Sequence, residues 1–161
     1  MKKIWIANDH GGYGLKLKFL NYFEEKGLDY CDVGCHSTDI VRYPYYAADV
    51  AHAVSLGEAT KGILICSTGI GMSIFANKYK SVRAALCTDS FQAKMTRSHN
   101  DSNILCLGGM ITGEMAALEI LDVWLNTEYM GGRHDISLGL IKEAEEYLCA
   151  SEEWVHSGPK L

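Results

Sequence analysis

Cys66 is the residue of this sequence with the clearest chemical potential. It ends the apolar run Gly62-Ile63-Leu64-Ile65 and is followed by Ser67-Thr68-Gly69-Ile70-Gly71. Glycines in such a turn let backbone N–H groups point toward a common centre, and the helix expected next adds the positive end of its dipole. This combination would stabilise a thiolate or an oxyanion. The alternative is a structural cysteine buried beside a tight turn, and the pattern alone favours neither.

Two familiar phosphate-binding motifs do not fit the glycines of this chain. A tyrosine-phosphatase loop requires an arginine six positions after its cysteine, and Met72 stands there. A dinucleotide-binding fingerprint requires the pattern G-x-G-x-x-G. The glycine pair at positions 69 and 71 is followed by Ile74 where the third glycine belongs, and the pair at 12 and 14 is followed by Leu17. The sequence therefore favours neither a tyrosine phosphatase nor a dinucleotide-binding protein.

Three polar pairs lie at expected ends of strands or helices. Asp9-His10 follows the first expected strand, and a carboxylate beside an imidazole suits acid–base chemistry, although the pair alone favours an aspartate that caps the next helix. His99-Asn100 ends an expected helix, where the helix dipole also favours a histidine. Arg133-His134 lies in the loop before the last expected helix, which an exposed turn would equally explain. The histidines lack metal-ligand spacing, and we expect neither a metal nor another cofactor.

Composition narrows the class of protein. The 161 residues fit one domain, and 48% hydrophobic residues suffice for one core. A formal net charge of -5 without a basic stripe argues against nucleic acid as a partner. No apolar run could span a bilayer, and the N-terminus lacks a signal peptide, so we expect a cytoplasmic protein. The six cysteines form no C-x-x-C pair, and we interpret them as reduced thiols.

Strand-like and helix-like segments alternate along the chain. Strands are expected at residues 3–7, 28–33, 62–66, 84–87 and 104–107, and the helices between and after them at about 15–26, 44–54, 70–77, 89–99, 113–125 and 137–148. This alternation predicts an α/β fold with a parallel sheet of about five strands, covered on both faces. Sites of such sheets gather at the carboxyl ends of strands. We expect a single domain over residues 1–150 and a loose tail over 151–161.

Several linked motifs resemble the ribose-5-phosphate isomerase B family, and the related galactose-6-phosphate isomerase subunits share much of the pattern. In chain order the motifs are Asn8-Asp9-His10-Gly11-Gly12, Tyr43-Pro44, residues 62–71, Ala76-Asn77-Lys78, Val82-Arg83-Ala84, His99-Asn100-Asp101 and Gly131-Gly132-Arg133-His134. The resemblance runs from Met1 to about Leu148. It implies a Rossmann-like three-layer αβα sandwich, assembled as a homodimer or homotetramer with active sites composed across the dimer interface. It also implies aldose–ketose isomerisation of a small sugar, in the first place a sugar phosphate, through a cis-enediolate and without a metal.

The resemblance further implies roles for individual residues. Cys66 would be the base that moves a proton between C1 and C2, and Thr68 would shuttle protons near the sugar oxygens. His99, with Asp9, would open the sugar ring. The substrate-binding residues would be His10 and Arg133 at the phosphate, Tyr43 and Asn100 at hydroxyl or oxyanion groups, and the backbone N–H groups of Ser67, Gly69, Ile70 and Gly71 at the enediolate.

Three positions depart from the family's pattern. Met110 and Ser137 stand where members usually carry arginine, and Arg42 precedes Tyr43-Pro44 where an acidic residue is common. Residues 108–114 look closer to the galactose-6-phosphate isomerase branch. We expect the fold and the reaction type to hold and the substrate to differ in chain length or phosphorylation, with Arg42 as an additional substrate ligand. A non-catalytic sugar-binding protein on the same scaffold fits less well, because the catalytic residue types are retained.

Overall fold

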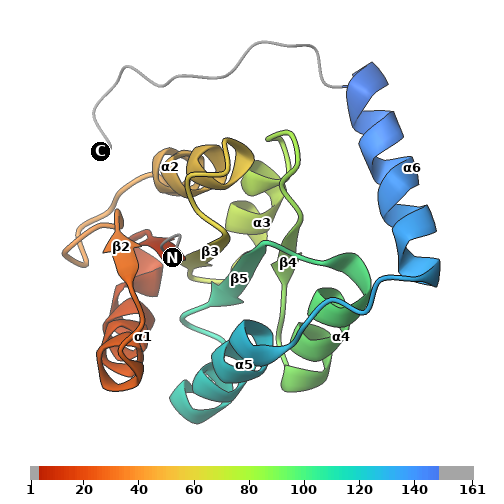
Figure 1. The fold of residues 1–161 in the computed structure, drawn as a ribbon. Coiled ribbons are helices and arrows are strands. Elements are labelled where there is room, and N and C mark those ends of the chain that lie inside the picture. Colours follow the sequence, from red (N-terminus) through yellow and green to blue (C-terminus); the bar gives the residue numbers. More distant parts are fainter. Residues whose placement is uncertain (1–3, 149–161) are drawn as a thin grey trace.

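The computed structural model describes residues 4–148, which form a parallel five-stranded sheet between two layers of helices (Figure 1). The strands are β1 (Ile4–Asn8), β2 (Tyr30–Asp32), β3 (Lys61–Cys66), β4 (Ala84–Leu86) and β5 (Ile104–Gly108). Their order across the sheet is β2-β1-β3-β5-β4, and every neighbouring pair is parallel. The predicted Rossmann-like αβα sandwich is therefore confirmed.

The helices divide between the two faces of the sheet. They are α1 (Tyr13–Lys26), α2 (Tyr43–Ser55), α3 (Ile70–Ala76), α4 (Ser90–Asn100), α5 (Glu114–Asn126) and α6 (Arg133–Leu148), with a short 3-10 helix η1 (His10–Gly12) before α1. One core cluster joins α2 and α3 to the sheet, and a second joins α1, α4 and α5 to its other face. Helix α6 stands apart from these layers in Figure 1 and contacts α4.

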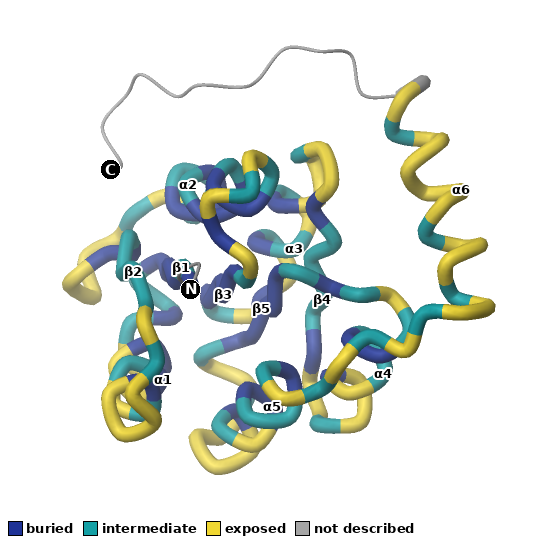
Figure 2. The backbone as a smooth tube through the Cα atoms, viewed as in Figure 1, coloured by how far each residue is buried: buried dark blue, intermediate teal, exposed yellow. Residues whose placement is uncertain are grey.

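Side-chain alternation along β3 decides where Cys66 points. Leu64 and Cys66 belong to the core on the α2–α3 face, whereas Ile63 and Ile65 belong to the core on the opposite face. Strand β3 is central, and all five residues from Gly62 to Cys66 are buried, as the dark-blue tube in Figure 2 indicates. Cys66 is thus the last side chain of a rigid, buried strand.

Most of the expected helix ends are confirmed. The Asp89 carboxylate accepts a hydrogen bond from the Gln92 N–H at 2.7 Å and caps α4. Gly27, with φ at +63°, ends α1 in a left-handed conformation. Pro44 lies in the first turn of α2, where its missing N–H costs nothing. Strand β2 is shorter than expected, because the Leu28 N–H is held by the Phe23 carbonyl in the cap of α1.

The start of the last helix was predicted wrongly. Helix α6 begins at Arg133, so Arg133 and His134 lie in its first turn and not in the preceding loop. Gly131 and Gly132 both have φ at +63° and make the turn before it. Asp135 then favours an early helix start, since an acidic side chain in the first turn complements the helix dipole.

The C-terminal tail and the absence of a membrane span were also expected. The expected tail, 151–161, and Cys149 lie outside the described residues, so the proposed domain boundary near residue 150 stays a prediction. In residues 4–148 we find no helix with the length and apolar character needed to cross a membrane.

A buried ion pair fixes the exit of β2. The ammonium of Lys16, whose side chain is 1% exposed, contacts the Asp32 carboxylate at 2.9 Å. It also donates to the Cys35 carbonyl at 2.7 Å. Asp32 in turn accepts a hydrogen bond from the Gly34 N–H at 2.9 Å. These bonds tie α1 to the beginning of the segment 33–42, which leads into α2.

We predict that Lys16→Met destabilises the fold strongly. The change leaves the Asp32 carboxylate, only 16% exposed, without its cation, and breaking a buried pair in this way costs about 3–5 kcal/mol. Lys18→Met is the matched control, because Lys18 pairs with Glu114 at 3.2 Å with both side chains about half exposed. That loss should be below ~1 kcal/mol. Urea unfolding of the three proteins measures the difference, and similar losses for both variants would contradict the role given to Lys16.

Candidate active site

The carboxyl ends of β1, β3 and β5 bring three loops into direct contact. The Asp9 N–H donates to the Ile65 carbonyl at 3.1 Å, which sets the exit of β1 beside the end of β3. On the other side, the Gly109 N–H donates to the Cys66 carbonyl at 2.8 Å, and the Met110 N–H donates to the Ser67 carbonyl at 3.1 Å. Asp9 and Cys66 therefore lie at the same edge of the sheet, as the parallel topology requires.

The turn after Cys66 directs a backbone donor at its sulfur. The Gly69 N–H donates to the Cys66 Sγ at 3.1 Å, and the thiol itself is buried. Gly69 has φ at +76°, and a Cβ there would lie 2.6 Å from the Leu86 Cδ1 and 2.8 Å from the Leu107 carbonyl carbon. Only glycine fits this position. An N–H donor at the sulfur stabilises negative charge that develops there.

Thr68 and Ser67 complete this turn. The Thr68 Oγ1 accepts a hydrogen bond from the Ile70 N–H at 3.3 Å, at the start of α3. Thr68 is exposed, so its hydroxyl is accessible at the edge of the sheet. Ser67 lies against η1, since a Cβ on Gly11 would fall only 2.2 Å from the Ser67 Oγ. The loops that carry Asp9 and Cys66 are thus packed too closely to move independently.

Asp9 caps the short helix η1, as the structural alternative for this residue anticipated. Its Oδ1 accepts hydrogen bonds from the Gly11 N–H at 2.9 Å and the Gly12 N–H at 3.3 Å. Burial raises the pKa of Asp9 above its ordinary value of 3.8, and the two N–H groups and His10 only partly oppose this effect. The carboxyl therefore caps η1 and also keeps its proton to a higher pH than an exposed aspartic acid does.

A cavity of about 470 Å³ opens beside Asp9 at the start of α2. Four predicted site residues line it, namely Asp9, His10, Arg42 and Tyr43. The His10 Nδ1 accepts a hydrogen bond from the Val41 N–H at 3.3 Å, which fixes this ring against the segment before α2. The Tyr43 ring packs over Gly71, where a Cβ would lie 2.8 Å from the Tyr43 Cζ. The cavity thus adjoins the turn that follows Cys66.

Sequence reasoning missed part of the wall of this cavity. The additional lining residues are Val41, Pro44, Tyr45 and Phe75. Pro44 and Tyr45 follow Tyr43 directly in the first turn of α2. Phe75 is four residues after Gly71 on α3, so helical spacing alone would have placed it on the same face. The wall is more aromatic than the predicted set of polar residues suggested.

The other predicted residues lie at the opposite edge of the sheet. Helix α4 runs antiparallel to the strands and ends at Asn100, near the start of β5. The Gly62 N–H donates to the Asn103 carbonyl at 2.8 Å, so this end of α4 lies level with the start of β3. That edge is about 13 Å from Cys66 along β3, at ~3.3 Å per strand residue. His99 and Asn100 therefore do not meet Cys66 or Asp9 within one chain.

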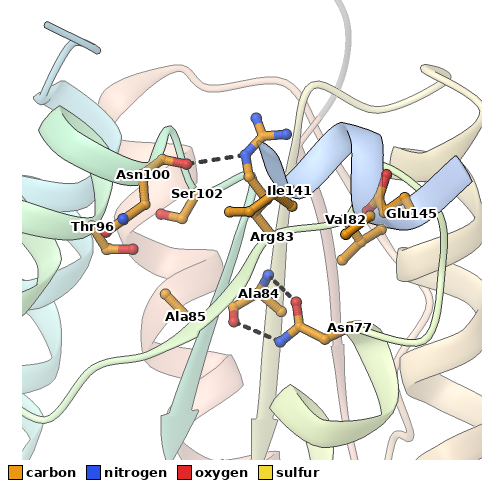
Figure 3. A pocket seen from close by; sticks show the side chains of 11 residues that line it. Asn77, Val82, Arg83, Ala84, Ala85, Thr96, Asn100, Ser102, Ile141 and Glu145 are labelled. Atoms are coloured by element: carbon orange, nitrogen blue, oxygen red, sulfur yellow. Dashed lines mark hydrogen bonds between the residues drawn. The ribbon is translucent and has the colours of Figure 1, made fainter. Parts of the chain in front are cut away.

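Asn100 borders a second cavity, of about 480 Å³, beneath α6 (Figure 3). The Arg83 Nε donates to the Asn100 carbonyl at 3.0 Å, and the Arg83 Nη2 contacts the Asp101 carboxylate at 2.8 Å. Arg133 is exposed in the first turn of α6. Its neighbour His134 stacks on His99, with ring centroids 4.2 Å apart. His99, Asn100 and Arg133 thus form a separate cluster, which we name the distal cluster.

Within the described part of the chain, no three His, Cys, Asp or Glu side chains are grouped so that they could hold a metal ion. The two clusters offer instead a thiol, a buried carboxyl, imidazoles, hydroxyls and backbone donors. These groups suit proton transfer on a small polar molecule.

Comparison with known proteins assigns this arrangement to a family. The profile of the Ribose/Galactose Isomerase family matches residues 4–141. The chain belongs to this family. The expectation of an isomerase of the ribose-5-phosphate isomerase B type is thereby confirmed at the level of the family.

Individual ribose/galactose isomerases resemble the chain over nearly its whole length. Ribose-5-phosphate isomerase B of Escherichia coli is 42% identical over 146 residues, which cover 91% of this chain and 98% of that protein. The structure of Clostridium thermocellum ribose-5-phosphate isomerase B superposes with a TM-score of 0.88 at 47% identity and covers 90% of this chain and 98% of that one. The D-erythrulose-4-phosphate isomerase of Pectobacterium atrosepticum is 38% identical over 82% of this chain and 88% of that protein. Members of the family with different named substrates are thus similar to this chain.

The raised pKa of Asp9 leads to a prediction about stability. Asp9 has a higher pKa in the folded than in the unfolded protein. As pH rises from the unfolded pKa through the folded pKa, the folded protein loses stability, because its buried carboxyl ionises less readily than the exposed one. Asp9→Asn does not titrate, yet its amide oxygen can still accept from Gly11 and Gly12. The stability of the wild type should therefore fall relative to that of Asp9→Asn as pH rises from about 4.

Urea unfolding of both proteins between pH 4 and pH 8 measures this divergence. Asp39→Asn is the control, because Asp39 is exposed and bonded only locally, to the Ser37 hydroxyl at 3.0 Å. It should show no comparable divergence. A wild type that gains stability over Asp9→Asn with rising pH would mean that the backbone donors outweigh burial at this carboxyl.

Proposed function

We propose that this protein interconverts an aldose and a ketose of a small sugar, in the first instance a sugar phosphate, with Cys66 as the proton-transferring base. The observation that supports the proposal most is the hydrogen bond from the Gly69 N–H to the Cys66 Sγ at 3.1 Å, beside a cavity that Asp9 and His10 line. A cytoplasmic location is part of the proposal, and the five cysteines of the described residues, all unpaired, are consistent with a reducing compartment.

The proposed chemistry moves one proton between neighbouring carbons. The Cys66 thiolate takes the proton from C2 of the open-chain aldose, and the electron pair of that bond shifts toward the C1 carbonyl oxygen. In the proposed mechanism the backbone N–H groups of the turn 67–71 hold the resulting cis-enediolate, and the Gly69 and Ile70 N–H groups exchange the Cys66 Sγ and the Thr68 Oγ1 for it. One such donor is worth roughly 10²–10³ in rate. Thr68 passes a proton between the two oxygens, and the thiol returns its proton to C1.

The distal cluster enters this mechanism through a second copy of the chain. His99, Asn100 and Arg133 cannot reach Cys66 of their own chain, so we propose a homodimer, or a homotetramer built from it, in which each site takes its distal cluster from the partner. Exposed apolar side chains near Cys66 and near the distal cluster support an interface. They include Met110 and Met115 at the carboxyl edge, 71% and 80% exposed, and Ile136 and Leu140 on α6, 70% and 61% exposed.

We predict that two inactive variants restore each other. Cys66→Ala and His99→Asn should each lose at least about a hundredfold in turnover of the cyclic sugar, since each removes an acid–base group. Refolded together in equal amounts, half of the dimers carry one chain of each kind, and each of these has one intact site. Roughly a quarter of the wild-type activity should return. Light scattering and melting curves of each variant check assembly and folding.

The absence of recovery in a mixture shown to contain mixed dimers would contradict the composite site. An active monomer at micromolar concentration would contradict it as well. A Cys66→Ala variant that retains most of its turnover on the best substrate would instead overturn the role of the thiol. These outcomes are separable, because only the last concerns the chemical step.

The choice of substrate depends on the charges that surround the two clusters. Met110, beside the turn of Cys66, offers no charge, and Ser137 is exposed in the second turn of α6. Arginine at these places would bind a phosphate in a bidentate manner. Arg42 instead lines the cavity next to His10. We propose that the usual pose of ribose 5-phosphate is weakened and that a sugar of another chain length, or without a phosphate, is preferred.

A substrate panel tests both the function and this preference. Values of kcat/KM for tetrose, pentose and hexose phosphates and for the free sugars should rank ribose 5-phosphate below another member by about tenfold or more.

Met110→Arg should raise kcat/KM for ribose 5-phosphate, since one charge-assisted bidentate contact is worth about 1.5–3 kcal/mol. Arg42→Met should lower kcat/KM for the preferred sugar. If ribose 5-phosphate is best by a wide margin, the departures at Arg42, Met110 and Ser137 do not set specificity. If no sugar is isomerised, the proposed function fails.

A further inference from the structure

His99 and His134 form a closely stacked pair of imidazoles. Their ring centroids are 4.2 Å apart and their planes differ by 13°. His99 comes from the last turn of α4 and His134 from the first turn of α6, so the contact joins two elements. Two rings at this separation touch over their faces, which restricts the plane that either ring can adopt.

The chain before α6 is built to hold this stack. The Met130 N–H donates to the Ser98 carbonyl at 3.0 Å, directly beside His99. The Tyr129 hydroxyl donates to the Asp135 carboxylate at 2.7 Å, which closes the segment back onto the start of α6. Gly131 and Gly132, both at φ +63°, make the turn between these two anchors. His134 is therefore placed by contacts on both sides and is not an incidental neighbour.

The charged groups around the pair disfavour a second proton. Burial, the neighbouring His99 and Arg133 together lower the pKa of His134, and Asp135 opposes them. Arg97 on α4 forms an ion pair at 2.8 Å with Asp101, the residue that follows α4, and Arg83 contacts the same carboxylate group at 2.8 Å. Two imidazolium rings in face contact would repel, so the pair takes up one proton much more readily than two.

The Nε2 atom of His134 is also shielded from solvent and has no hydrogen-bond partner among residues 4–148. A protonated ring would leave a charged N–H there without an acceptor, which is costly. A neutral ring with its proton on Nδ1 leaves only an unbonded lone pair. The surroundings of His134 therefore favour its neutral form.

We propose that His134 is a positioning residue for His99, whose ring plane it fixes by face-to-face contact. The proposal rests on the role of His99 in ring opening. In that step the bond between C1 and the ring oxygen breaks and the C1 carbonyl forms. His99 gives a proton to the ring oxygen, and Asp9 accepts the proton of the anomeric hydroxyl. His134 touches neither the sugar nor the transferred proton.

Two variants separate the effects of the stack. His134→Phe keeps a flat ring against His99 but cannot titrate, whereas His134→Ala removes the ring. We expect His134→Ala to slow turnover of the cyclic sugar by about tenfold or more, since a small misplacement of a catalytic group can cost up to ~10². Turnover of an acyclic substrate should change little. His134→Phe should recover most of the cyclic turnover. His36→Ala, which removes a histidine side chain that is 77% exposed, is the control and should change neither.

Titration of the histidine Cε1 protons by NMR provides a readout that does not depend on activity. In the wild type the signals of His99 and His134 should respond to each other's protonation, and His99→Asn should raise the pKa of His134. Equal losses on cyclic and acyclic sugars in His134→Ala, or independent titration of the two rings, would overturn the proposal. If instead His99→Asn itself affects both substrates equally while the rings titrate as a coupled pair, the role of His99 in the proposed function fails and the coupling of the pair stands.

Discussion

All five strands of the sheet run in the same direction, so each connecting helix must run back, and this constraint governs where chemistry can gather. Residues that follow strands reach the carboxyl edge, as Asp9 and Cys66 do. Residues that end helices reach the amino edge, as His99 does at the end of α4. The separation of the two clusters is therefore a consequence of topology, and a second chain is the simplest way to join them.

Sequence alone located Asp9 and Cys66, the residues at the carboxyl edge of the sheet, because each of them has a local signature. Cys66 ends an apolar run before a glycine-rich turn, and Asp9 ends another, and parallel strands then bring both to one edge. The burial that raises the pKa of Asp9 has no such signature. It depends on η1 packing against Ser67, which is a contact between segments almost sixty residues apart in the chain.

The distal cluster could be listed from the sequence but could not be placed. Periodicity identifies His99 as the end of a helix without giving its distance from Cys66. The stack with His134 was out of reach for a different reason: it requires the turn at Gly131 and Gly132 and a helix that starts four residues earlier than the hydrophobic pattern indicates. Polar first turns carry little hydrophobic signal, so their helical character becomes visible only with the capping geometry. The spacing of Gly71 and Phe75 on α3 could have placed Phe75 on the cavity face, but only the tertiary contact between α3 and the start of α2 shows that this face lines a cavity.

Helix α6 connects assembly to chemistry in the proposed dimer. It carries Arg133 and His134 in its first turn, and Ile136 and Leu140, four residues apart and both exposed, form an apolar stripe on it. In an isolated chain this stripe faces water, and each such side chain forgoes about 1.5–3 kcal/mol of burial. A partner that covers the stripe fixes α6, and with it the polar first turn that supports His99. In the proposed dimer, burial of the stripe and completion of the site would be one event, so the free energy of association would also order His99, the proposed ring-opening group.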